Sequence, residues 1–87
     1  MIVASFAVDH AGNILGHPQL SAPGLLDADD PETMRVVDDF SDAIADLPVA
    51  TRRDDDALAE AARGALRRTI NRRLKKRPRV DVHLLRV

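Results

Sequence analysis

The fold is decided by residues 57–87, ALAEAARGALRRTINRRLKKRPRVDVHLLRV, in which a helical pattern gives way to a strand pattern at a proline. Apolar and small residues recur at spacings of three or four as far as Lys75. They predict one buried stripe, made of Leu58, Ala62, Ala65, Leu66, Thr69 and Ile70. Pro78 is expected to stop this helix, because proline cannot continue its hydrogen bonds. Residues 79–87 then predict a closing strand, with Val80, Val82 and Leu84 on one face and Asp81 and His83 on the other.

A second helix is predicted upstream. The run 29–32 (DDPE) favours a helix start, because carboxylates satisfy the free N–H groups of the first turn and proline suits its first position. Pro48 is expected to end this helix. Its apolar stripe is predicted to be Met34, Val37, Phe40, Ile44 and Leu47. The acidic run 54–56 caps the helix of residues 57–75 in the same way.

The N-terminal residues predict a hairpin. Residues 2–8 (IVASFAV) are typical of a central strand, because both of its faces are apolar or small. Residues 9–13 predict a turn and residues 13–16 a short partner strand, whereas the prolines and glycine of residues 17–26 predict a loop. The element order β-β-α-α-β indicates an α+β fold of two layers, a three-stranded sheet faced by two helices.

Composition narrows the classes of function. A chain of 87 residues makes one domain, residues 1–87. The absence of cysteine excludes a disulfide scaffold and a thiolate site, and it suits a reducing compartment, so we expect a cytoplasmic protein. No apolar run approaches the roughly 20 residues that span a bilayer, so no membrane partner is expected. Only Phe6 and Phe40 are aromatic, which leaves no platform for stacking bases.

Catalytic motifs are missing from the sequence. It contains no nucleophile elbow, no Gly-rich phosphate loop and no His-Glu-x-x-His motif. His10, His17 and His83 could meet at a metal in one sheet, but their spacing matches no metal motif. Positions in a turn, in a loop and on a solvent-facing strand explain these three histidines better. The carboxylates of residues 27–32 lack the spacing of a calcium loop and are expected to cap a helix. We therefore expect no catalytic residue and no metal ligand here.

The net charge of −1 hides two halves of opposite sign. Residues 1–51 carry nine acids and one base, and residues 52–87 carry twelve bases and five acids. Nine bases and no acid lie between Arg63 and Arg79. A phosphate backbone would offset this surplus, so the candidate RNA contacts are Arg67, Arg68, Arg72, Arg73, Lys75, Lys76 and Arg77. Three alternatives stay open: a solvated face, complementation of the helix C-terminus, or pairing with the acidic first helix.

The order of these motifs resembles the C-terminal domain of ribonuclease J over essentially the whole chain. In that family a Val/Ile-rich strand and a hairpin precede a Pro-x-x-Ser-x-x-Gly loop, here Pro18, Ser21 and Gly24. An arginine-rich helix end then leads through Arg77 and Pro78 into a closing strand. The family commonly has Ser-Arg-Gly where this chain has Ser-Ala-Pro-Gly at residues 21–24, so the role of that arginine does not carry over.

The resemblance implies a non-catalytic module. Ribonuclease J is a metallo-β-lactamase/β-CASP nuclease that binds zinc and degrades RNA as a 5′-to-3′ exonuclease, with endonuclease activity in some members. Its His-x-His-x-Asp-His metal motif lies in an upstream catalytic domain and does not occur here. The chain would thus be an isolated C-terminal domain of a larger zinc-dependent hydrolase, without a cofactor of its own. In the family this domain is a three-stranded sheet faced by two helices, implicated in self-association.

Two functions stay open at this point. The first is an accessory domain that supports RNA processing and degradation through self-association, with RNA contact by the basic helix. The second is a protein-interaction domain without RNA contact, which dimerises or docks onto proteins of the RNA-degradation machinery. A homo-oligomer is expected in both, because a small sheet leaves edge strands exposed, among them the closing one.

Overall fold

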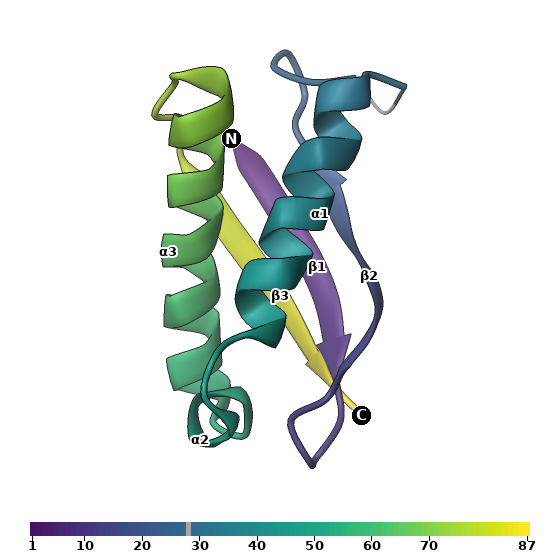
Figure 1. The fold of residues 1–87 in the computed structure, drawn as a ribbon, viewed down its shortest axis with the longest axis vertical. Helices are drawn as coiled ribbons and strands as arrows, with labels where there is room; N and C mark the ends of the chain where they lie inside the picture. The colour runs from purple at the N-terminus through teal and green to yellow at the C-terminus, as the bar shows by residue number, and fades with distance from the viewer. Residues whose placement is uncertain (28) are drawn as a thin grey trace.

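Within residues 1–27 and 29–87, which the computed structural model describes, three strands and three helices form two layers (Figure 1). β1 (Ile2–Val8), β2 (Ile14–Ser21) and β3 (Val80–Arg86) make one sheet. α1 (Pro31–Ala45) and α3 (Asp55–Leu74) lie side by side across one face of it, and the short α2 (Val49–Arg52) joins them. The predicted two-layer α+β fold is confirmed, and α2 is an addition to it.

The sheet has the strand order β2-β1-β3, with β1 in the centre as predicted. β1 runs antiparallel to β2 and parallel to β3. A parallel pair needs a long crossover between its strands, and α1, α2 and α3 supply it. Ile2, Ala4, Phe6 and Val8 of β1 are buried and face the helices.

The core lies between this face and the two long helices. The predicted stripe of α3 is confirmed in full, and its alanines Ala62 and Ala65 let the helix pack close to the sheet. Phe40 of α1 is 1% exposed and meets Phe6 edge to face, with ring centroids 6.0 Å apart. The N-caps also form as predicted: Asp30 accepts a hydrogen bond from the N–H of Glu32, and Asp54 accepts one from that of Ala57.

The predicted partner strand of residues 13–16 was too short, and the loop predicted for residues 17–26 was wrong over its first part. β2 continues to Ser21 and contains Pro18, which is buried. A proline is tolerated here because β2 is an edge strand. The register slips at this point: Ser5 lies opposite Gln19 and Ala7 opposite Leu15. Gly16, with φ 66°, allows the strand to absorb the extra residues.

The stripe predicted for α1 was wrong in its first turns. Thr33 and Val36 are buried with Phe40 and Ile44, whereas Met34 is 67% exposed. Thr33 can be buried because its hydroxyl donates a 2.6 Å hydrogen bond to the carbonyl of Asp27. The predicted end at Pro48 was also wrong: α1 stops at Ala45, and Pro48 precedes α2.

Candidate functional site

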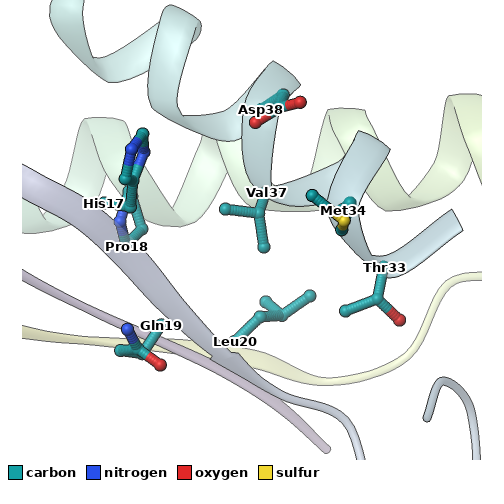
Figure 2. Close-up of a pocket in the computed structure, with 8 residues that line it drawn as sticks. All are labelled: His17, Pro18, Gln19, Leu20, Thr33, Met34, Val37 and Asp38. Carbon is teal, nitrogen blue, oxygen red and sulfur yellow. The ribbon is translucent and has the colours of Figure 1, made fainter. Parts of the chain in front are cut away.

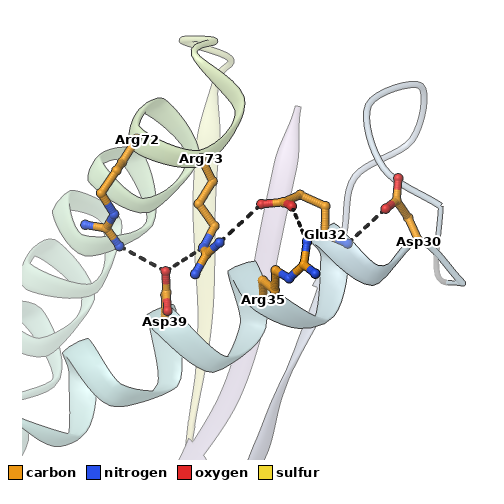
Figure 3. A network of polar contacts seen from close by, with 6 residues as sticks. All are labelled: Asp30, Glu32, Arg35, Asp39, Arg72 and Arg73. Carbon is orange, nitrogen blue, oxygen red and sulfur yellow. Dashed lines mark hydrogen bonds and ion pairs between the residues drawn. The ribbon is translucent and has the colours of Figure 1, made fainter.

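The basic residues at the end of α3 and just after it fall into two groups. The first group, Arg72 and Arg73, turns toward α1 (Figure 3). The Nε of Arg73 donates to Oδ2 of Asp39 at 2.6 Å, and its Nη1 lies 3.4 Å from Oε1 of Glu32. Arg72 donates to the same oxygen of Asp39 at 3.1 Å. For these two residues, pairing with the acidic helix is what the structure shows. Their ion pairs tie α1 to α3.

The contacts change the acidity of the partners. The hydrogen bond from Arg73 lowers the pKa of Asp39 below its ordinary value, and Arg72 acts in the same direction. Asp39 raises the pKa of Arg73 in turn. Earlier on α3, Arg63 pairs with Glu60 at 2.6 Å and lowers the pKa of that carboxyl.

Asp39 should therefore make folding sensitive to acid. A carboxylate whose pKa is lowered in the folded state stabilises it above an unfolded pKa of about 3.9, and this contribution is lost as the pH falls through the folded value. Asp39→Asn is expected to lower the Tm at pH 7 by about 4 °C. It should also flatten the decline of Tm below about pH 4, although Asp9 and Glu60, whose pKa values are also lowered, preserve part of that decline.

The matched control for this change is Asp38→Asn, one residue away on an exposed position of α1. Asp38 has no ion pair within the described residues, so its loss should leave the Tm nearly unchanged. Thermal melts followed by circular dichroism between pH 2 and pH 7 compare the two. Equal Tm values for both variants at pH 7 would contradict the role given to Asp39.

The second group of bases has no carboxylate within ion-pair distance in the part of the chain that the structure describes. All five side chains are exposed: Arg67, Arg68, Lys75, Lys76 and Arg77. Lys75 ends α3 in the left-handed conformation, with φ 57°, and the chain then turns back beside the helix. Arg77 and Pro78 consequently line a hollow of about 290 Å³ together with Arg67, Arg68 and Asn71.

The opposite end of the molecule carries arginines that bind backbone carbonyls. Arg86 of β3 donates to the carbonyls of Asp9 at 2.7 Å and of Arg52 at 3.1 Å, and it pairs with Asp55. Arg52 donates to the carbonyls of Leu47 and Gly12. These contacts join the β1–β2 turn, α2 and the start of α3. They could not be predicted from the sequence, because every residue has a backbone carbonyl and the residue type does not show which carbonyl accepts a hydrogen bond.

The face of the sheet that the helices leave open is partly apolar. Ala7 pairs with Leu15 on one side and Leu85 on the other, so these three side chains form one row across the sheet. Leu85 is 63% exposed. The row borders a shallow hollow of about 480 Å³, which His17, Gln19 and His83 also line.

A further hollow, of about 320 Å³, lies between α1 and the edge strand β2. Figure 2 shows Val37 directed toward Leu20, with Met34 beside them. His17 and Asp38 lie at its border.

Comparison with models of protein families identifies the family of this chain. The family model of the ribonuclease J C-terminal domain matches residues 1–87, the whole chain. The chain belongs to the ribonuclease J C-terminal domain family. The resemblance predicted from the motif order is thereby confirmed. A search of curated proteins finds no match.

As a ribonuclease J C-terminal domain, the chain is an accessory part of that enzyme. Its histidines are not gathered: His17 and His83 line the open face of the sheet, whereas His10 lies in the turn after β1. Among the described residues, no group of three or more metal-ligating side chains is placed to hold an ion. No helix within them is long and apolar enough to cross a membrane. Of the carboxylates in the run 27–32, Asp30 caps α1 and Glu32 pairs with Arg35 and Arg73.

Proposed function

We propose that this domain supports the RNA degradation of its parent ribonuclease in two ways, by self-association and by contact with RNA. Hydrolysis, and the zinc that it requires, would belong to the parent catalytic domain, in the cytoplasm. The observation that carries the proposal is the division of the basic residues. Two of the seven candidates are engaged with α1, and five are left on the surface without a carboxylate partner in the described residues.

RNA contact is supported by the chemistry of those five side chains. Unpaired guanidinium and ammonium groups bind phosphate oxygens and release counterions from the nucleic acid. Phe6 and Phe40 both lie in the core and the sequence has no Tyr or Trp, so no large aromatic ring is left to stack on a base. Binding should therefore depend on the RNA backbone and weaken as salt rises.

Self-association is supported by the open face and the edges of the sheet. Leu15 and Leu85 are exposed on that face, and burying such side chains between two copies is favourable. β2 and β3 are the outer strands, and exposed edges pair readily with another chain. The alternative, protein interaction without RNA contact, is favoured by the hollow between β2 and α1, where exposed Met34 offers an apolar contact.

Self-association is tested by a substitution on the open face of the sheet. Sedimentation velocity of the 87-residue chain from about 5 to 500 μM should show a concentration-dependent dimer. Leu85→Glu should reduce the dimer at least about tenfold, because it puts a charge into the apolar row that the second copy would bury. Met34→Glu is the matched control, since Met34 is similarly exposed but lies on α1, and it should leave the dimer intact. A wild-type monomer at the highest concentration would overturn self-association.

RNA contact is tested separately by fluorescence anisotropy with a labelled oligouridine of about 12 nucleotides. We expect binding at about 50 mM NaCl that weakens at least about tenfold at 200 mM. A dimer that binds no RNA at the lower salt concentration would favour the protein-interaction alternative.

A further inference from the structure

The hollow at the end of α3 is a notch with an unusual lining. Arg67, Arg68 and Asn71 lie on consecutive turns of α3, and Arg77 and Pro78 approach them from the segment that leads into β3. Its volume of about 290 Å³ is several times the roughly 30 Å³ that one water molecule occupies. The notch thus has room for a small polar group with water around it.

The charges around the notch have the same sign. In the described residues none of the three arginines that line it has its guanidinium group within 4.0 Å of a carboxylate. Elsewhere on α3 the chain does provide partners: Arg63 has Glu60, and Arg72 and Arg73 share Asp39. Three arginines that line one hollow carry charges of the same sign, which repel one another, and an anion between them would offset this repulsion. The charge of the residues that line the notch thus favours a negative ligand.

We propose that this notch binds one phosphate group of the backbone of single-stranded RNA, an inference that rests on the RNA contact proposed above. Arginine presents paired N–H donors whose spacing matches two phosphate oxygens, and three arginines can hold one phosphate from several sides. The amide of Asn71 adds a further donor. The negative end of the α3 dipole opposes an anion here, but charge-assisted hydrogen bonds to guanidinium groups are stronger than that effect.

The surroundings favour an RNA backbone over an isolated phosphate. Lys76 and Arg79 are exposed and adjoin the two notch residues of the 77–78 segment, so basic side chains continue beyond the notch. Such a track suits the successive phosphates of a strand. With no exposed aromatic residue beside it, the notch would hold the strand by its backbone and leave its bases free.

The test compares two variants that lose the same charge. The notch variant is Arg67→Gln, Arg68→Gln and Arg77→Gln. The control is Lys75→Gln, Lys76→Gln and Arg79→Gln, three exposed bases that do not line the notch. Both should keep the melting temperature of the wild type, because none of the six residues has an ion pair within the described part of the chain. Affinity for the labelled oligouridine is measured at about 50 mM NaCl.

We expect the notch variant to lose at least about tenfold in RNA affinity and the control about two- to threefold. Equal losses of RNA affinity in the two variants would overturn the proposal that the notch binds a phosphate, but RNA contact by a diffuse basic surface would still hold. No RNA binding by the wild type would overturn both. A titration with inorganic phosphate, monitored through the NMR signals of the Asn71 side-chain amide, distinguishes a phosphate of the RNA backbone from free phosphate as the ligand. If phosphate saturates the notch while RNA fails to compete for it, the ligand is a free phosphate and the RNA assignment is wrong.

Discussion

Phe40→Ala is expected to remove most of the stability of this domain. The ring is 1% exposed and packs edge to face on Phe6, at an interplanar angle of 71°. Truncating a buried phenylalanine costs about 3–5 kcal/mol, because apolar contact is lost and a cavity remains. The free energy of unfolding of a domain of this size is only about 5–10 kcal/mol. Urea denaturation followed by circular dichroism should show a midpoint at less than about half the wild-type urea concentration.

Two further variants separate this cavity effect from a general sensitivity of α1. Phe40→Leu retains much of the buried volume and should fold cooperatively with a smaller loss of about 1–2 kcal/mol. Met34→Ala lies on the same helix but on an exposed position, so its urea midpoint should stay near that of the wild type. If Phe40→Ala were no less stable than Met34→Ala, the contact between α1 and the sheet would not be the centre of the core.

Arg86→Ala is expected to have the second largest effect, at about 2–3 kcal/mol. Its guanidinium donates to Asp9 and Arg52 carbonyls and pairs with Asp55 at 2.6 Å, so one side chain joins three separate segments. Its removal takes the donor from the carbonyl of Arg52 and one of two donors from the carbonyl of Asp9, which still accepts from the N–H of Gly12. A partly buried carbonyl that loses its donor costs more than the hydrogen bond contributed.

The controls for this arginine come from the same end of the molecule. Arg86→Lys keeps the charge but has a single ammonium group, so it should recover only part of the loss. Arg53→Ala removes one exposed contact, a 3.3 Å hydrogen bond to the Ala11 carbonyl, and should cost less than about 0.5 kcal/mol. Equal losses for Arg86→Ala and Arg53→Ala in urea denaturation would show that the three contacts of Arg86 do not hold this end together.

The elements with strong local patterns could be predicted from the sequence. α3 has a regular stripe of buried residues from Leu58 to Ile70 and an acidic N-cap, and the structure shows both at the predicted positions. β2 was mispredicted because Gly16 and Pro18 act as breakers in a central strand, yet both fit an irregular edge strand. The stripe of α1 was misplaced because Val36 and Val37 are equally apolar, and only packing on the sheet selects Val36.

The candidate site could be predicted less completely than the fold. The basic run singled out the end of α3 and the segment after it, but a charge count does not reveal which arginines have partners. Arg73 meets Asp39 across 34 positions of sequence, so the pairing depends on how α1 packs against α3. The notch depends likewise on the turn at Lys75, which brings Arg77 back beside Arg67.

The central claim is that the arginines at the end of α3 and just after it have two separate roles, and one comparison tests it most directly. RNA affinity and Tm are measured for two double variants of equal charge, Arg72→Gln with Arg73→Gln and Arg67→Gln with Arg77→Gln. The account predicts that the first pair lowers the Tm by several degrees and changes RNA affinity less than about threefold, since these arginines already hold Asp39. The second pair should keep the Tm and lose at least about tenfold in affinity. The account is contradicted if the first pair loses as much RNA affinity as the second while the Tm stays unchanged.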